Sequence, residues 1–189
     1  MTINNSFFSK RRSIKAADMA SYALDPSDLE LILAAGIRVP DHGALNPWRI
    51  VVIQGNKLKE LDQEIILSEF IKANPQALQN EIKIESTRLQ RAGVVIAVLS
   101  TPVEHPKIQV WEMQLSSAAV CMNLLVCAQS MGYAAQWLTE WYAYNEAMLL
   151  RLGGDPTKDK ISGFIYIGSK IEEPKERRRP DSKNIITYL

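Results

Sequence analysis

Chemically reactive side chains are scarce in this sequence of 189 residues, which contains two cysteines and two histidines. Neither His42 nor His105 lies near a paired acid and nucleophile, so we do not expect a hydrolytic triad. The sequence also lacks GxGxxG and Walker loops, CxxC pairs, HExxH motifs and GxSxG elbows. A metal site built on Asp41 and His42 would need further ligands, and none are suitably spaced. The chain therefore takes its chemistry from a cofactor, or it has none.

Net charge and long apolar runs are also lacking. The formal net charge of +1 argues against broad binding to nucleic acids or anionic membranes, because both require a concentrated basic surface. No uninterrupted apolar run reaches the roughly 18 residues of a spanning helix, and residues 1–13 contain no apolar leader segment. Cys121 and Cys127 point to different faces of an apolar helical stretch, which indicates reduced core thiols. We expect a cytoplasmic protein with neither nucleic-acid nor membrane partners.

What is present is an alternation of long helices and short strands, within a length that fits one domain, residues 1–189. The patterns predict helices at 25–38, 57–72, 76–92, 108–131 and 145–154, and strands at 48–56, 94–100, 133–138 and 161–168. Asp25 is suited to cap the first helix, and Pro26 to its first turn. The helix at 108–131 is apolar nearly all round, so it belongs in the core or in a subunit interface. These elements indicate an α/β or α+β three-layer sandwich.

Three segments carry polar groups suited to a ligand, and each has a plainer interpretation. Residues 11–15 (RRSIK) supply two guanidiniums, a hydroxyl and an amine that suit a phosphate, or they form a solvated helix face. The loop RVPDHGALNPW, residues 38–48, offers His42 and Trp48 to a ligand, or it is turn chemistry. Residues 136–139 (QWLT) end a predicted strand, where ligands meet open sheets, although Trp137 could belong to the core.

Taken together, and in this order, these segments resemble the FMN-dependent nitroreductase family, and in particular its short, minimal branch. The resemblance runs from RRS through AGIRVPDH…NPWRIVVI, the small-residue helix and GYAAQWL to GFIYIGSK. It implies an α+β, nitroreductase-like three-layer sandwich, with a central and mostly antiparallel sheet flanked by helices. It also implies an intertwined homodimer with the flavin between chains, in which residues 108–131 form the central helix and residues 185–189 extend over the partner.

The resemblance assigns the phosphate end of FMN to the N-terminal motif. It implies that Arg11 and Ser13 contact the phosphate and the ribityl chain, with Arg12 adding backbone or side-chain contacts. It also implies that Lys15 reaches the N1/O2 edge of the flavin, where a fixed cation stabilises the negative charge of the reduced ring. The run Arg177 to Arg179 either supplies a further phosphate-binding cation or is a solvated charge run.

The remaining cofactor-binding residues implied by the resemblance lie elsewhere in the chain. Arg38 would share the role of Lys15, and His42 would come from the other subunit. Gln136, Trp137, Leu138 and Thr139 would pass along the flavin. The chain departs from some relatives at Leu138, where they carry a basic residue, so a polar contact from that position is excluded.

The implied activity is ping-pong transfer of a hydride from NAD(P)H, through flavin N5, to a small-molecule acceptor such as a nitroaromatic or a quinone. No catalytic acid or base and no metal are required, which fits the scarcity of reactive side chains. Two other interpretations remain open. The chain could bind or sequester FMN without turnover, or it could be a ligand-free dimeric scaffold whose arginines are solvated.

Overall fold

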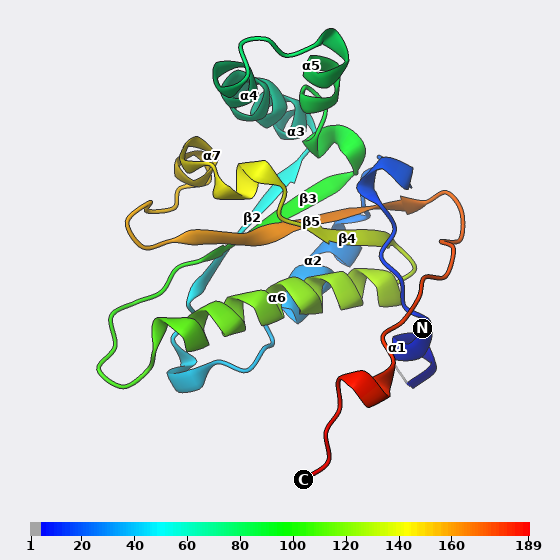
Figure 1. Cartoon of the computed structure of the whole chain (residues 1–189), viewed down its shortest axis with the longest axis vertical. Coiled ribbons are helices and arrows are strands. Elements are labelled where there is room, and N and C mark those ends of the chain that lie inside the picture. Colours follow the sequence, from blue (N-terminus) through cyan, green and yellow to red (C-terminus); the bar gives the residue numbers. More distant parts are fainter. Residues whose placement is uncertain (1–4) are drawn as a thin grey trace.

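A computed structural model describes residues 5–189, so residues 1–4 of the segment analysed for a leader lie outside it. Its centre is an antiparallel sheet with β5 in the middle (Figure 1). β3 and β4 both pair with β5, β2 pairs with β3, and the short β1 pairs with the end of β5. The strands are β1 (Met19–Ala20), β2 (Trp48–Gln54), β3 (Val94–Ser100), β4 (Ala134–Leu138) and β5 (Lys160–Lys170).

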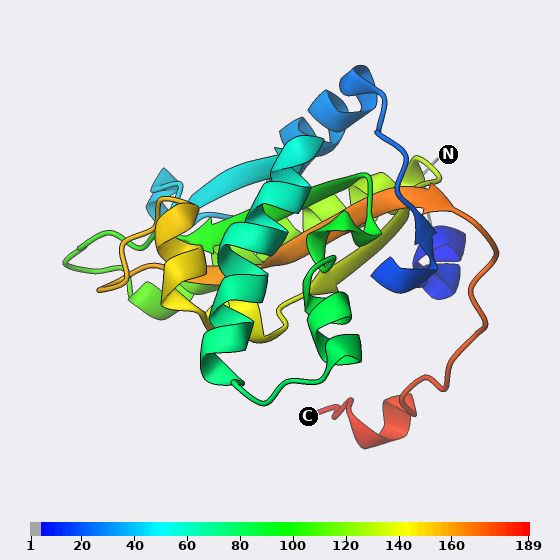
Figure 2. The same ribbon diagram turned by 90° about the horizontal axis from the view of Figure 1, so that it is seen from above.

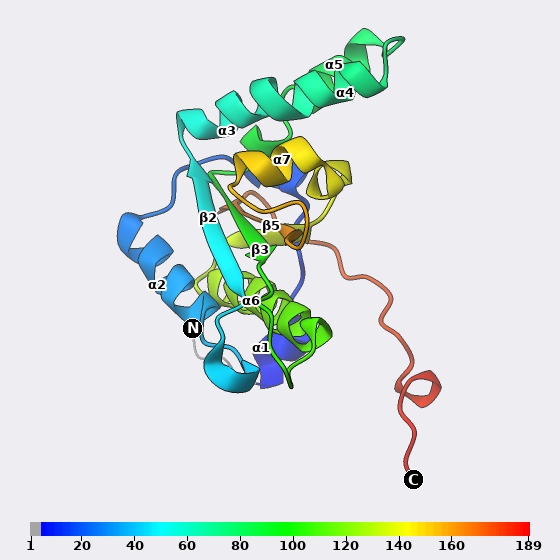
Figure 3. The same ribbon diagram turned by 90° about the vertical axis from the view of Figure 1, so that its left-hand side faces the viewer.

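Helices cover both faces of this sheet. The helices are α1 (Asn5–Lys10), α2 (Pro26–Gly36), α3 (Asn56–Leu61), α4 (Ser68–Ala73), α5 (Gln79–Glu85), α6 (Val110–Ser130) and α7 (Glu146–Arg151). α2 and α6 lie on one face, and the α3–α5 region and α7 lie on the other (Figures 1 and 3). Figure 2 shows the run from α3 to α4 lying across its face of the sheet.

The buried strand β3 separates two apolar clusters, because successive side chains of a strand point to opposite faces. Val95, Ala97 and Leu99 join the cluster beneath α3 and α7. The alternate residues, Val94, Ile96 and Val98, pack toward α2 and α6. This arrangement confirms the predicted α+β three-layer sandwich with a central antiparallel sheet.

The helix ends follow the local sequence. The Asp25 carboxylate accepts a hydrogen bond of 2.8 Å from the amide of Ser27 and so caps α2, with Pro26 as its first residue. At the end of α6, Gly132 adopts a φ of +95°. This conformation lets the amides of Gly132 and Tyr133 donate to the last carbonyls of α6, each at 3.1 Å. These two contacts turn the chain directly from α6 into β4.

Two secondary-structure predictions are wrong. The helix expected at 76–92 forms only at Gln79–Glu85, because the buried carboxylate of Asp62 takes the amides of Leu89 and Gln90. Residues 11–15 do not form the solvated helix face that was the plainer interpretation, since α1 ends at Lys10 and the chain then runs alongside β4. β1 was not predicted, because two residues carry no periodicity. The helix expected at 57–72 forms as α3 and α4 joined by a π-helical segment, Asp62–Leu67.

The expectation that no segment is long and apolar enough to span a membrane is wrong for α6. It has the length and composition of a helix that could cross a membrane, although the buried core helix of a folded domain meets the same criterion. The sequence criterion missed it because Ser, Gln and Asn interrupt the apolar run, whereas Glu112 is its one charged residue. Both thiols of α6 are free, as expected, with Cys121 buried and Cys127 partly exposed.

Candidate functional site

The N-terminal motif is held against the outer edge of β4, which pairs only with β5 among the described strands. The amide of Ile14 donates to the Ala135 carbonyl at 3.3 Å, and the amide of Ala16 donates to Gln136 Oε1 at 2.6 Å. Ile14 is buried in the core. Alternate residues of an extended segment share a side, so Ser13 and Lys15 lie on the side away from that core. The edge of the sheet therefore brings together three predicted site residues: Ser13, Lys15 and Gln136.

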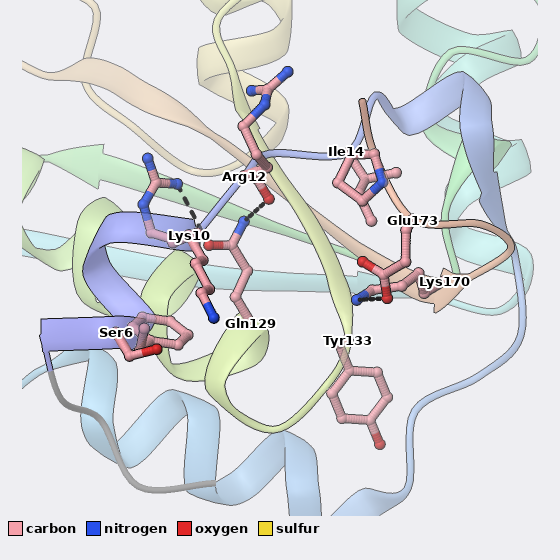
Figure 4. A pocket seen from close by; sticks show the side chains of 11 residues that line it. Ser6, Lys10, Arg12, Ile14, Gln129, Tyr133, Lys170 and Glu173 are labelled. Atoms are coloured by element: carbon pink, nitrogen blue, oxygen red, sulfur yellow. Dashed lines mark hydrogen bonds and ion pairs between the residues drawn. The ribbon is translucent and has the colours of Figure 1, made fainter. Parts of the chain in front are cut away.

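A cavity of about 450 Å³ opens beside this motif (Figure 4). Four cationic side chains contribute to its wall: Lys10, Arg11, Arg12 and Lys170. Gln129, in the last turn of α6, braces the motif by donating to the Arg12 carbonyl at 3.0 Å and accepting from Arg11 at 3.4 Å. One carboxylate of the wall, Glu173, is paired with Lys170 at 2.9 Å. The cavity is therefore strongly positive.

The C-terminal segment adds further cations at the same place. Arg179 donates to the Arg11 carbonyl at 3.3 Å and pairs with Glu176 at 3.0 Å. Burial lowers the pKa of Arg11, and the neighbouring charges of Arg179, Arg12 and Arg177 lower it further. No ion pair of Arg11 occurs among residues 5–189. Repulsion among these guanidiniums would be relieved by an anion, so the cluster suits a phosphate.

A second cavity of about 420 Å³ adjoins the first and shares Arg12, Ile14, Glu173 and Pro174 with it. Its wall also includes Ser13, Lys15 and Lys175, together with the carboxylates of Asp18 and Glu172. A ligand that reaches from the arginine cluster toward Lys15 would therefore need a phosphate at one end and polar groups along its length.

The predicted residues at 136–139 lie at and just beyond the end of β4, with their side chains in different surroundings. The Gln136 side chain is committed to the amide of Ala16. Trp137 packs in the α6-side cluster and donates to the Ser162 carbonyl at 3.1 Å. Leu138 packs against the opposite cluster, and Thr139 is exposed. The side chain of Trp137 thus packs in the core, as the plainer interpretation had it, whereas its backbone lies at the sheet edge.

His42 lies at the other end of α6, whereas the Arg38 carbonyl accepts a hydrogen bond of 2.8 Å from Asn123, in the second half of that helix. His42 Nδ1 donates to the Glu112 carboxylate at 2.7 Å, and this bond lowers the pKa of Glu112. The loop that carries His42 is strained, with positive φ at Gly43, Ala44 and Asn46. Arg38 is exposed.

The two ends of α6 are far apart within one chain. Glu112, beside His42, and Gln129, beside Arg11, are separated by 17 residues of helix, which is about 25 Å at the usual rise per residue. One chain therefore does not bring His42 to the arginine cluster.

Some residues of the site lie outside the predicted segments. Gln129, Lys10 and Lys170 line the cavity but were not predicted. A polar residue in the last turn of an otherwise apolar helix was a usable signal for Gln129. The two lysines carried none, because isolated lysines are common on surfaces. No group of side chains suited to a metal ion occurs in the described part of the chain.

The fold and the arginine-lined cavity define a class of protein: an α+β sandwich with an anion-binding site at one edge of its sheet. Within that class, the model of the nitroreductase family matches residues 8–169, and the chain belongs to this family. It is therefore an enzyme of an oxidoreductase family. The chain is 30% identical over 186 residues, 95% of each protein, to an Escherichia coli K12 protein named "Putative NAD(P)H nitroreductase YdjA".

Solved structures share the fold. A nitroreductase-like family protein from Bacillus cereus superposes with a TM-score of 0.83 at 21% identity, over 100% of this chain and 98% of that one. A nitroreductase with bound FMN from Bacteroides fragilis superposes with a TM-score of 0.71, also at 21% identity, over 99% and 100% of the two chains. The family resemblance inferred from the sequence motifs is thus confirmed.

Proposed function

We propose that this chain is an FMN-dependent NAD(P)H oxidoreductase that reduces nitroaromatic or quinone acceptors in a ping-pong cycle. The observation that carries the proposal is the pair Arg11 and Arg12 in the wall of a cavity beside the sheet edge, with Arg177 and Arg179 close to Arg11. A doubly charged phosphate ester fits that cluster. The name of the Escherichia coli relative and the FMN bound to the Bacteroides fragilis protein support the same cofactor and reductant.

The residues present fit the phosphate and ribityl end of FMN. Arg11 and Ser13 would hold these groups, and Arg12 would contribute from the shared wall of the two cavities. Of the three C-terminal arginines, we assign Arg179 to the phosphate because it lies against the Arg11 backbone. FMN, when bound, supplies the hydride-accepting chemistry that the side chains lack.

The ring end of the cofactor would lie toward the end of β4. Lys15 would lie near the flavin N1/O2 edge and offer a fixed positive charge there. Gln136 would position this lysine indirectly, through its bond to the amide of Ala16. Trp137, Leu138 and Thr139 would present the strand end to the ring.

We also propose that the working unit is a homodimer built on α6, with one domain, residues 1–189, from each chain. The outer face of α6 carries an apolar stripe at helical spacing, which includes Trp111, Leu115 and Met122, exposed by 65, 49 and 37%. Two copies of α6 related by a twofold axis perpendicular to the helix would run antiparallel. That pairing would bring the partner's His42 to the arginine cluster and complete the site between chains, with the partner's Arg38 alongside the second half of its own α6.

The first experiment is an anaerobic visible spectrum of the purified protein, before and after addition of NADH or NADPH. We expect a yellow protein that either nucleotide bleaches. A yellow protein that stays yellow with both nucleotides would contradict the oxidoreductase activity and leave a flavin-binding protein. A colourless protein that cannot be reconstituted with FMN would contradict the assignment of the cofactor. We expect the protein in the cytoplasm, where reduced nicotinamides are available.

A further inference from the structure

The chain bends sharply after β4, at a residue with unusual backbone geometry. Glu140 has a φ of +46° and a ψ of 177°. Among residues 5–189, three non-glycine residues have positive φ, and the other two, Ala44 and Asn46, belong to the His42 loop. Such a conformation is costly for a residue with a side chain, so it persists only where surrounding contacts hold it.

Side chains of the α3–α5 layer supply those contacts. The Glu140 carboxylate pairs with Arg91 at 2.9 Å and with Arg88 at 3.5 Å. The next residue, Trp141, donates its indole N–H to the buried Glu85 carboxylate at 3.0 Å. Two successive side chains, at the bend and directly after it, are therefore tied to the helical layer above the sheet.

The second residue after the bend, Tyr142, is anchored in the same direction. The hydroxyls of Tyr142 and Tyr166 are 2.5 Å apart, and both side chains are fully buried. The guanidinium of Arg91 lies 5.1 Å from the centre of the Tyr166 ring. The ion pair of Arg91 and Glu140 therefore joins the bend to a network that includes Tyr142 and Tyr166.

Arg91 is itself held in place from within that layer. The fully buried Asp62 accepts hydrogen bonds from the amide of Leu89 at 2.8 Å and from the side chain of Gln90 at 2.8 Å. Arg91 follows directly and donates from Nε to the Arg88 carbonyl at 2.7 Å. The contacts of Asp62 with Leu89 and Gln90 are therefore joined to the ion pair of Arg91 through the backbone of residues 89–91.

We propose that Glu140 and Arg91 are positioning residues for the cofactor. Their ion pair holds the strained bend, and the bend sets the course of residues 137–139 along the sheet edge. Neither side chain lines the two cavities beside the N-terminal motif, so the pair acts through the backbone. This inference rests on the proposed FMN site and adds to it a means by which the far helical layer shapes that site.

The test is a titration of apoprotein with FMN, followed by quenching of the flavin fluorescence, together with the visible circular dichroism of the bound flavin. Glu140→Gly removes the anchor and tolerates positive φ, so this variant is expected to fold. We expect its FMN dissociation constant to rise at least tenfold, with an altered flavin dichroism. Glu140→Gln and Arg91→Lys should show the same changes to a lesser degree.

Glu64→Gln is the matched control, because it breaks an exposed ion pair of 3.4 Å with Arg151 in the same helical layer. Its FMN affinity should stay within twofold of wild type. Folded Glu140 and Arg91 variants that bind FMN as tightly as wild type would overturn the inference. So would loss of folding in all three, because the pair would then serve only the stability of the chain. A wild-type apoprotein that binds no FMN would instead refute the proposed function.

Discussion

The two helical layers of the sandwich are built in opposite ways. The α6 layer buries serines but no charged side chain, and it leaves an apolar stripe facing outward. The α3–α5 layer buries Asp62 and Glu85 and satisfies both within the chain. The first layer has an unpartnered apolar face, and the second has its polar groups paired internally. We therefore expect surface changes on α6 to affect assembly and changes at Asp62 to affect the stability of one chain.

The largest effect is expected from a charge in the α6 stripe. Met122→Glu would place a carboxylate in the proposed dimer interface, and an unpaired buried charge is strongly disfavoured. The variant should be monomeric by light scattering, and its FMN affinity should fall more than a hundredfold because the site loses its second half. Ile71→Glu is the control, since Ile71 is a similarly exposed apolar residue, at 43%, in the other layer. A dimeric Met122→Glu protein with bound FMN would contradict the interface.

Asp62→Ala should have the next largest effect, on stability rather than on assembly. The change leaves the amides of Leu89 and Gln90 without their acceptor in a buried place. We expect a loss of about 3 kcal/mol in the free energy of unfolding, measured by urea denaturation. The exposed change Glu64→Gln should alter that free energy by no more than about 0.5 kcal/mol. Equal stabilities of the two variants would show that Asp62 has no such role.

Arg11→Ala should weaken FMN binding by about 1–3 kcal/mol, the usual contribution of a charged hydrogen bond. Fluorescence titration of the apoprotein measures this change. Arg178→Ala is the matched control, because no ion pair or hydrogen bond of Arg178 occurs among residues 5–189. Equal affinities of the two variants would refute the phosphate assignment.

Asp62 also predicts a pH dependence that distinguishes its layer. Burial raises the pKa of Asp62 above its ordinary value of 3.8, despite the hydrogen bonds it accepts. The folded state then binds this proton more tightly than the unfolded state, so this residue makes stability fall as pH rises from about 3.8 through the folded pKa. Urea denaturation of wild type and Asp62→Asn across pH 4 to 7 should show that contribution in wild type only. Parallel pH profiles would contradict it.

The smallest effect concerns the two thiols of α6. Burial raises the pKa of Cys121 to about 12, and it raises the pKa of the less buried Cys127 as well. At pH 8 only about 10⁻⁴ of Cys121 would be thiolate. A thiol reagent should therefore modify Cys127 first and leave Cys121 unmodified until the protein unfolds. Mass spectrometry of the labelled peptides checks the order, and Cys127→Ser shows what remains.

Local patterns were sufficient for much of the fold. The cap at Asp25, the apolar run of α6 and the β-branched run at 94–100 all form the predicted elements. The end of α5 could not be predicted, because it depends on Asp62, which is remote in sequence. The ion pair of Arg91 and Glu140 was invisible for the same reason, since 49 residues separate its members.

The candidate site divides along the same line. The phosphate-binding motif is contiguous in sequence, so it could be predicted from its residue types. The structure places further cations, Lys10 and Lys170, beside it. The extended conformation of this motif could not be predicted from its residue types. It depends on hydrogen bonds that the amides of Ile14 and Ala16 donate to β4, which is remote in sequence. Which arginine of 177–179 approaches Arg11 was also undetermined, since it depends on how the C-terminal segment returns to α1.

The place of β5 in the sheet has a consequence for how the chain reaches its fold. β5 is the last strand to be synthesised, yet β1, β3 and β4 all pair with it. The β2–β3 pair can form early, but the sheet closes only after residue 170 has left the ribosome. Such long-range closure slows folding and leaves strand edges open in the meantime. During translation this protein therefore carries unpaired edges at β3 and β4 until almost its whole length has emerged.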